Sequence, residues 1–283
     1  MPEQNIPEIK GSLRDFMLKV PEPIYRCSGI KILGRRIKSV LFSTDASIIR
    51  NTNADAVIAV YPFTPQPVIT QAVMVAADVP VFVGVGGGLT QGHRVVNLAL
   101  HAEFQGAIGV VVNAPTRNET IKELHRTIDV PIVVTVLSED EDIQGRIDAG
   151  VSILNISAAG RTPQVVRNIR ERFPDIPIIA TGGPTEESII TTVEAGANAI
   201  TWTPPSNGDV FKDIMDKYRH GEPTRIFNRI SRPEIYSERL FSHDSVQLNK
   251  PPSEFISPAA ILLYYFAFNR LRTLSTRSMA LFT

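Results

Sequence analysis

The chain has 283 residues, of which 43% are hydrophobic and 20% charged, and its 29 basic and 29 acidic side chains give a net charge of zero. This combination excludes intrinsic disorder over most of the chain. Without a positive excess, a dedicated nucleic-acid-binding protein is not expected. The single cysteine, Cys27, cannot form an internal disulfide and is not in a spacing typical of a metal site. We therefore expect a cytoplasmic globular protein.

No stretch of the chain reaches the roughly 18 to 20 apolar residues that cross a bilayer. The longest apolar run, residues 259 to 268, contains two tyrosines and is followed by Arg270 and Arg272. The first ten residues hold two glutamates and two prolines where a secretion signal has a basic segment and an apolar core. We expect neither a membrane span nor a leader.

A repeated pattern of short apolar segments predicts eight strands. Three of them begin with an acidic residue, a β-branched residue and a proline, at residues 78 to 83, 129 to 134 and 175 to 180. Three alternate with these and are entered through a glycine suited to end a helix, at residues 106 to 112, 150 to 155 and 196 to 201. Two more lie upstream, at residues 39 to 43 and 55 to 60.

Helical patterns with apolar residues three and four apart separate these strands. They cover residues 48 to 51, 67 to 77, 91 to 105, 118 to 128, 141 to 149, 163 to 173, 186 to 195 and 208 to 219. Strands that are apolar on both faces and separated by helices are expected to be parallel. The pattern therefore predicts an α/β fold of the (β/α)8 or TIM-barrel class over residues 38 to 220, with an open doubly wound sheet as the competing fold.

Two extensions flank the predicted barrel. Residues 1 to 37 form an N-terminal extension that we expect to cover the bottom of the barrel or to pack beside it. Residues 221 to 283 form a C-terminal extension that ends in an amphipathic helix. Because an isolated apolar helix needs a partner, we expect it to pack on the barrel or on another copy of the chain, which favours a homo-oligomer.

Lysines and clustered metal ligands are missing from the strand ends, where a TIM barrel carries its chemistry. The eight lysines lie at positions 10, 19, 31, 38, 122, 212, 217 and 250, none of them at the end of a strand. A Schiff-base mechanism is therefore excluded. Carboxylates and histidines near the strand ends lie on separated strands, so we expect no catalytic metal.

Two glycine clusters favour an anionic ligand. Gly86, Gly87 and Gly88 follow the third strand, and Gly182 and Gly183 follow the seventh. Glycines let a backbone approach a ligand closely, and the start of the next helix adds a partial positive charge. The alternative for both clusters is a tight turn that requires positive φ angles.

The segment from Ile178 to Pro184 and on through Thr201 resembles the strand-seven to strand-eight half of phosphate-binding TIM barrels, those that bind ribulose phosphates or flavin mononucleotide (FMN). The resemblance implies that Gly182 and Gly183 contact a phosphate. The sequence departs from these families after strand eight, where it has Trp202 and two prolines. Two glutamates, at 186 and 187, would also repel a phosphate on the axis of the next helix, so Ser206, Asn207 and the N–H of Gly208 are alternative contacts.

A fainter likeness is to flavin-dependent nitronate monooxygenases and related enoyl reductases. It rests on Gly87-Gly88, on Gly92-His93-Arg94 and on the segment from Cys27 to Ile30. This resemblance implies FMN as a possible cofactor, although no cofactor is firmly indicated.

Single polar residues at the strand ends complete the candidate site. Asp45 is a candidate general base, with helix capping as the alternative, and His93 is a second candidate for proton transfer, with a solvated helix start as the alternative. Asn113 and Asn155 end strands of the same parity and are expected to face one ligand. Arg161 could pair with an anion, and Trp202 could form a wall or lid.

These residues favour an enzyme of the lyase, isomerase or epimerase kind that acts on a small anionic, phosphorylated metabolite. Proton transfer would come from Asp45 or His93, and anion binding from the glycine turns. Three alternatives stay open: an FMN-dependent oxidoreductase, a hydrolase, and a barrel that binds a ligand without catalysis.

Overall fold

The computed structural model describes residues 7, 9 and 17 to 220 of the chain. The predicted C-terminal extension, its amphipathic helix and the homo-oligomer contact assigned to it lie outside the described residues.

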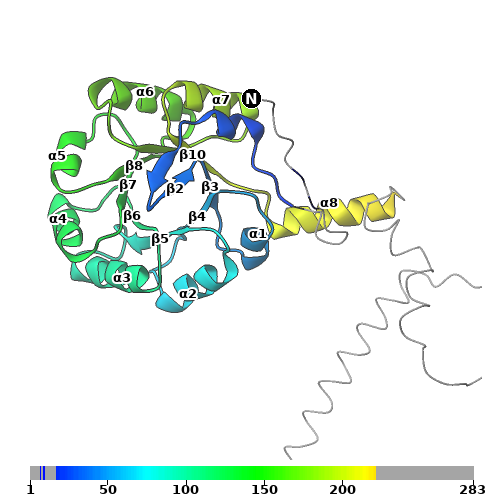
Figure 1. The fold of residues 1–283 in the computed structure, drawn as a ribbon, viewed down its shortest axis with the longest axis horizontal. Coiled ribbons are helices and arrows are strands. Elements are labelled where there is room, and N and C mark those ends of the chain that lie inside the picture. The colour runs from blue at the N-terminus through cyan, green and yellow to red at the C-terminus, as the bar shows by residue number, and fades with distance from the viewer. Residues whose placement is uncertain (1–6, 8, 10–16, 221–283) are drawn as a thin grey trace, which may run out of the picture. The chain divides into compact units, whose positions relative to one another are not determined.

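Eight parallel strands close into a barrel, in the order β10-β3-β4-β5-β6-β7-β8-β9 (Figure 1). The closure confirms the predicted TIM barrel and rules out the open doubly wound sheet. The strand bounds are β3 Ser39–Phe42, β4 Ala56–Ala59, β5 Val81–Gly86, β6 Gly109–Val112, β7 Ile132–Val136, β8 Ile153–Ile156, β9 Ile178–Thr181 and β10 Ala199–Trp202.

A helix follows each strand, and in Figure 1 the helices α1 to α7 surround the strands. Their bounds are α1 Ala46–Arg50, α2 Pro67–Ala76, α3 His93–Phe104, α4 Asn118–Thr127, α5 Ile143–Asp148, α6 Thr162–Arg172, α7 Glu186–Glu194 and α8 Asn207–Arg219, with a 3-10 turn, η2, over Ala159–Arg161. The three glycines predicted to end helices, Gly106, Gly150 and Gly196, all have positive φ angles.

The core has two layers because the strands are apolar on both faces. One cluster fills the barrel interior and includes Val40, Phe82 and Ile179. The larger cluster lies between the strands and the helices and includes Leu41, Leu154 and other fully buried side chains. The burial of each such side chain contributes roughly 1.5–3 kcal/mol to stability. This burial fixes which strand residues point inward and which point outward, and therefore which strand positions can face a ligand.

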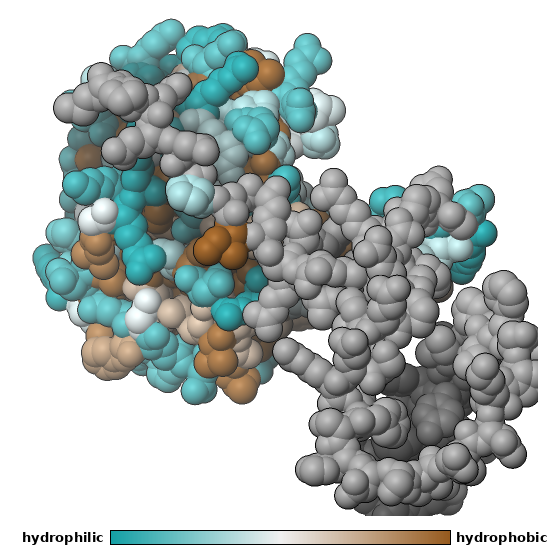
Figure 2. All heavy atoms as spheres, turned by 45° about the vertical axis from the view of Figure 1, so that its right-hand side comes forward, coloured by the Kyte–Doolittle hydropathy of each residue, from teal (hydrophilic) through white to brown (hydrophobic). Residues whose placement is uncertain are grey.

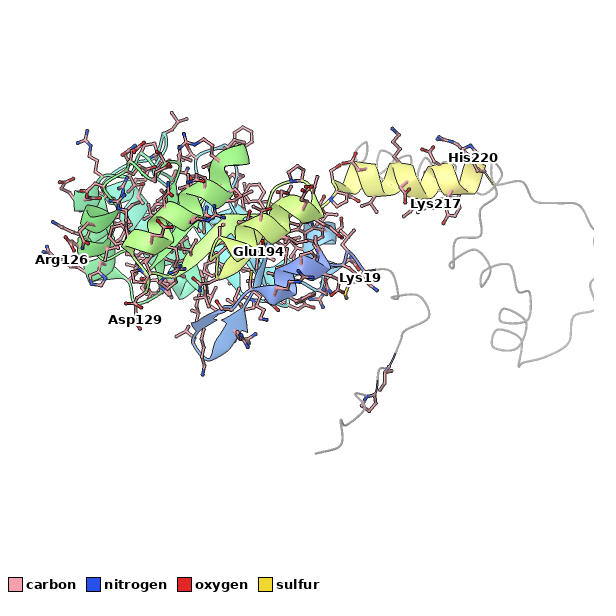
Figure 3. All side chains as sticks on the ribbon, turned by 90° about the horizontal axis from the view of Figure 1, so that it is seen from above. Lys19, Arg126, Asp129, Glu194, Lys217 and His220 are labelled. Carbon is pink, nitrogen blue, oxygen red and sulfur yellow. The ribbon has the colours of Figure 1, made fainter. Side chains whose placement is uncertain are left out.

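The N-terminal extension closes one end of the barrel. Strands β1 (Ile30–Ile32) and β2 (Arg35–Ile37) form an antiparallel hairpin whose isoleucines join the interior cluster. The N–H of Gly29 donates to the carbonyl of Asn198, just before β10, at 2.8 Å. Figure 3 shows the hairpin on the side of the barrel where Asp129, which precedes β7, is labelled. The hairpin thus lies at the end where strands begin, and the described residues leave the opposite end open.

The 3-10 helix η1 (Glu22–Arg26) packs against α7, beside the barrel (Figure 1). Ile24 of this helix is fully buried. By contrast, α8 has no fully buried residue. The face in Figure 2 is largely hydrophilic, with apolar side chains scattered between polar ones. No described helix is both long enough and apolar enough to cross a membrane.

Candidate ligand site at the mouth of the barrel

The barrel interior changes from apolar to polar at its open end. Ile153 and Ala199 belong to the apolar interior cluster, and two residues farther along the same strands lie Asn155 and Thr201. Because side chains alternate along a strand, these polar residues point to the same side as the apolar ones. The result is an open end lined by hydroxyl and amide groups, which we call the mouth.

The mouth contains a central cavity of about 300 Å³. Two further cavities adjoin it, since all three share Val60 and Asn113. One of about 200 Å³ lies against the loop after β5, and one of about 600 Å³ lies against the loops after β3 and β10; we call them the glycine-side cavity and the rim cavity. The described residues that line the central cavity are Phe42, Ile58, Val60, Val111, Asn113, Thr135, Asn155, Ser157, Thr181, Thr201 and Thr203.

Two buried polar atoms of the central cavity have no hydrogen-bond partner among the described residues: Asn155 Oδ1 and Thr201 Oγ1. Asn155 is 9% exposed and Thr201 is 7% exposed. The Asn155 amide donates through Nδ2 to Thr135 Oγ1 at 3.3 Å, which leaves its oxygen free to accept. An unsatisfied buried polar atom costs roughly 1–3 kcal/mol. Both residues line the central cavity, so these two atoms are the candidates for bonding a ligand there.

None of the described residues that line the central cavity carries a charge. In the adjoining cavities, the titratable side chains among the described residues are Tyr61 and Asp45. The Tyr61 hydroxyl accepts a hydrogen bond from the N–H of Gln66 at 2.8 Å and keeps its own proton available. No group of three or more His, Cys, Asp or Glu side chains in the described part of the chain could hold a metal ion.

Asp45 lines the rim cavity and also caps α1. Its Oδ1 accepts hydrogen bonds from the N–H of Ser47 at 2.8 Å, from that of Ile48 at 3.2 Å, and from the Ser47 hydroxyl at 2.6 Å. The Ser47 hydroxyl bond, followed by the two backbone bonds, lowers the pKa of Asp45 below its usual value and outweighs the opposing effect of burial. The side chain is thus a carboxylate at neutral pH with one oxygen committed to the helix.

His93 and Arg161, the other charged candidates, do not line the three cavities. His93 is the first residue of α3; its side chain is 86% exposed, and its Nδ1 lies 2.8 Å from Glu123 Oε1. Arg161 donates from Nη2 to Glu139 Oε2 at 2.8 Å. His93 therefore contacts Glu123, and Arg161 forms an ion pair with Glu139, both outside the three cavities.

Local packing explains most of the first glycine cluster. A Cβ on Gly87 would lie 2.1 Å from Thr116 Oγ1 and 2.7 Å from the backbone nitrogen of Asn113, and Gly87 has a φ of +97°. Gly86 also has a positive φ and packs on Thr90. Gly88 differs, because its Cβ would meet nothing closer than the Asn113 amide at 3.9 Å. Gly86 and Gly88 line the glycine-side cavity.

The second cluster is also tightly packed. A Cβ on Gly182 would lie 2.7 Å from Ile200, and Gly183, with a φ of +81°, lies against Ser188. Ser188 and Thr185 form a capping box that satisfies the start of α7. Asn207, the first residue of α8, lines the rim cavity, and the start of that helix carries its own capping box from Ser206 to Asp209. Both helix starts next to the resemblance segment are therefore capped by protein groups.

Trp202 and Cys27 lie away from the mouth. Trp202 packs against the outer cluster, because Thr201 and Thr203 on either side of it face the cavity. Cys27 is 2% exposed, and burial raises the pKa of its thiol to about 11, so a thiolate mechanism is not supported.

The lining residues that were not singled out as candidates from the sequence form the polar ring and its aromatic neighbour: Phe42, Thr135, Ser157, Thr181, Thr201 and Thr203. The signal for Phe42, Thr135, Thr181 and Thr201 is their position, two residues after an inward apolar residue near the end of a strand, and Ser157 and Thr203 lie two residues after Asn155 and Thr201.

Comparisons with known proteins agree with this architecture. No protein-family model matches the sequence. An inosine-5'-monophosphate dehydrogenase from Halalkalibacterium halodurans is 26% identical over 196 residues, which cover 62% of this chain and 37% of that protein. The chain thus spans well under half the length of this relative.

Three solved structures share the architecture. A candidate phosphonomutase from Burkholderia cenocepacia is 16% identical with a TM-score of 0.52, over 71% of this chain and all of that one. A phosphonopyruvate hydrolase in complex with oxalate and Mg²⁺ is 13% identical with a TM-score of 0.51, over 86% of this chain and 95% of that one. A mandelate oxidase mutant with an FMN adduct is 15% identical with a TM-score of 0.51, over 62% of this chain and 68% of that one.

At these identities the structural likeness shows the fold alone. The chain is an α/β TIM barrel, and the comparisons assign no specific reaction to it.

Proposed function

We propose that the protein is an enzyme of the lyase, isomerase or epimerase kind that binds a small polar metabolite in the mouth of the barrel. The observation that carries this proposal is the pair of buried, unpartnered atoms, Asn155 Oδ1 and Thr201 Oγ1, in one cavity at the end where the strands terminate. TIM-barrel enzymes have their active sites at this end. A cavity of about 300 Å³ with a few converging polar groups is of the size that small ligands occupy.

General acid–base chemistry without a Schiff base is the reaction type that we propose. Asp45 and Tyr61 both line the rim cavity, so a carboxylate and a phenol proton face one space. The lowered pKa of Asp45 keeps it ionised and makes it a weak base, best suited to accept a hydrogen bond from a substrate hydroxyl or amide. His93 takes part only if a substrate reaches the start of α3, outside the three cavities.

The resemblance to phosphate-binding barrels implies an anionic group on the substrate. The binding of such a group would depend on backbone N–H groups. None of the described residues that line the three cavities is cationic. Gly88 is the candidate contact for such a group, because neither a positive φ nor close packing requires a glycine at this position. Asn207 and Gly183 are the further candidates.

A flavin-dependent oxidoreductase is the second candidate, and one observation favours it. The flavin ring carries an N–H between two carbonyl groups, which fits the uncharged cavity and the free Asn155 oxygen. The flavin phosphate fits less well, since no described lining residue is positive. Absorbance near 450 nm in the purified protein would distinguish this function, and its absence after reconstitution with FMN would exclude it.

Thermal unfolding with a metabolite panel tests the proposed function. Inorganic phosphate, phosphorylated sugars and uncharged metabolites are added to the wild-type protein and to Thr201→Val. A true ligand at 100 times its Kd stabilises the fold by about 2.7 kcal/mol, a rise in Tm of roughly 5–10 °C for a domain of this size. We expect the rise in the wild type and a smaller one in Thr201→Val. A panel in which every shift is equal in the two proteins would refute a site in the mouth.

A further inference from the structure

We infer that the part of the ligand held in the central cavity is an uncharged planar ring whose edge carries an N–H group next to a carbonyl, as in a nucleobase. This inference rests on the proposed function and adds the chemical class of the ligand. The juxtaposition of an unpartnered amide oxygen, an unpartnered hydroxyl and an exposed phenyl ring in one uncharged cavity carries it.

The charge of the recognised part follows from the cavity lining. The described side chains around the central cavity are hydroxyls, amides and hydrocarbons. A buried ion needs an opposite charge or a metal, because moving it out of water is costly. The two titratable side chains nearby, Asp45 and Tyr61, belong to the adjoining cavities. A phosphate or carboxylate on the same ligand would therefore lie in the rim cavity or outside it.

The hydrogen-bonding edge follows from the free atoms. With Asn155 Nδ2 bonded to Thr135, the free Oδ1 can only accept, so the ligand supplies an N–H or O–H. Thr201 Oγ1 both donates and accepts, so it can bond a carbonyl on the same edge. Asn155 is on β8 and Thr201 on β10, with only β9 between them in the barrel. Neighbouring donor and acceptor groups on one ligand edge match this arrangement.

The planar shape follows from Phe42. This residue is two positions after Val40, which lies in the barrel interior, and it ends β3, the strand next to β10. Its side chain is 40% exposed and lines both the central cavity and the rim cavity. A large apolar ring exposed among hydroxyl groups provides a surface on which a flat ring can stack. The polar edge of such a ring would then reach toward β8 and β10.

Calorimetric titration with matched ligands tests the inference. The probes are uracil and hypoxanthine, and the controls are 1,3-dimethyluracil and 1-methylhypoxanthine, which lack the N–H next to the carbonyl, and dihydrouracil, which keeps that edge on a puckered ring. We expect at least one probe to bind and the matched control to bind at least 10-fold more weakly. Stacking of a base on an aromatic side chain predicts that Phe42→Ala weakens binding by about 5- to 100-fold.

Three outcomes separate the inference from the proposed function. Probe binding that is lost in Phe42→Ala and in Thr201→Val supports both, and Phe42→Leu, which keeps an apolar side chain, controls for a folding defect. If a ring-free metabolite such as ribose 5-phosphate binds and Thr201→Val weakens it while the rings do not bind, the inference is wrong and the proposed function stands. If Thr201→Val changes the affinity for no metabolite, both are wrong.

Discussion

Substitutions at Asp45 can separate the structural role of this side chain from its chemical role. Its carboxylate caps α1 and lines the rim cavity, so a simple alanine substitution would disturb both. Asparagine at this position keeps an oxygen that can accept from the N–H groups of Ser47 and Ile48 and removes only the charge. We therefore compare Asp45→Ala with Asp45→Asn.

The expected magnitude follows from the three hydrogen bonds that Oδ1 accepts. Loss of an N-cap side chain costs about 1 kcal/mol, in a range of roughly 0.5–2. For a domain of about 200 residues, 1 kcal/mol corresponds to a fall in Tm of roughly 2–4 °C. Asn and Asp are nearly equivalent caps, so Asp45→Asn is expected to remain within about 0.5 kcal/mol of the wild type.

The pH dependence has a defined sign. Because the folded protein lowers the pKa of Asp45, the carboxylate stabilises the fold above its unfolded-state pKa of about 3.9, and this contribution is lost as the pH falls through the lower folded-state value. The stability difference between the wild type and Asp45→Ala should therefore be constant from pH 8 to about 5 and shrink below about 4.

Urea unfolding of the three proteins across this pH range measures the differences. If Asp45→Asn is destabilised as much as Asp45→Ala, the capping account is wrong. If Asp45→Asn folds normally and loses ligand binding or turnover, the carboxylate acts on the ligand, as we propose.

Four further substitutions test the loops around the mouth. Gly87→Ala should lower the free energy of unfolding in urea by at least about 1–3 kcal/mol, because its Cβ would overlap Thr116 and φ is positive. Gly88→Ala should change that free energy by no more than about 0.5 kcal/mol and reduce only the Tm rise caused by an anionic ligand. Arg146→Met should cost roughly 1.5–3 kcal/mol, since the guanidinium bonds the carbonyls of the loop after β6, and an unchanged unfolding midpoint would contradict that role. His93→Ala should change stability by at most about 1 kcal/mol and leave ligand affinity unchanged; weakened binding would place this side chain in the site.

The fold could be predicted from the sequence because each strand is apolar on both faces and each helix carries its apolar residues at helical spacing. The errors lie at the bounds of the elements, and those at the starts have local causes. Strands β5 and β7 begin at Val81 and Ile132, after the prolines that we included, because proline has no N–H to give to the ladder. Helix α3 begins at His93, since Gly92 has a φ of 60°.

The candidate site could be predicted only in part. Asn113 and Asn155 were identified because they end strands of the same parity and because an amide is costly to bury without a partner, and the structure places both on the central cavity. The threonines of the same ring were not identified, because threonine is also an ordinary strand residue. Trp202 was expected to face a ligand, but the register of β10 directs it toward the outer cluster. Only the barrel geometry shows which alternate residues face inward.

The hairpin of β1 and β2 was not predicted as such. Its strands are three residues each, too short to show a period, and two arginines interrupt the apolar pattern of β2. The residues 1 to 37 were expected to lie below or beside the barrel, and the described part of this segment includes the hairpin against the interior and η1 against α7.

The central claim is that the polar residues of the mouth bind a ligand and do not stabilise the fold. The most direct measurement is the free energy of unfolding of Thr201→Val without added ligand, with Thr162→Val as the matched control, because the Thr162 hydroxyl accepts from the N–H of Ala158 at 3.0 Å. Replacing an unpartnered hydroxyl by a methyl group is expected to leave stability unchanged or raise it, whereas the control should lose about 1 kcal/mol. A loss in Thr201→Val as large as in Thr162→Val would mean that the hydroxyl is bonded within the protein, and the assignment of the mouth as a ligand site would fail.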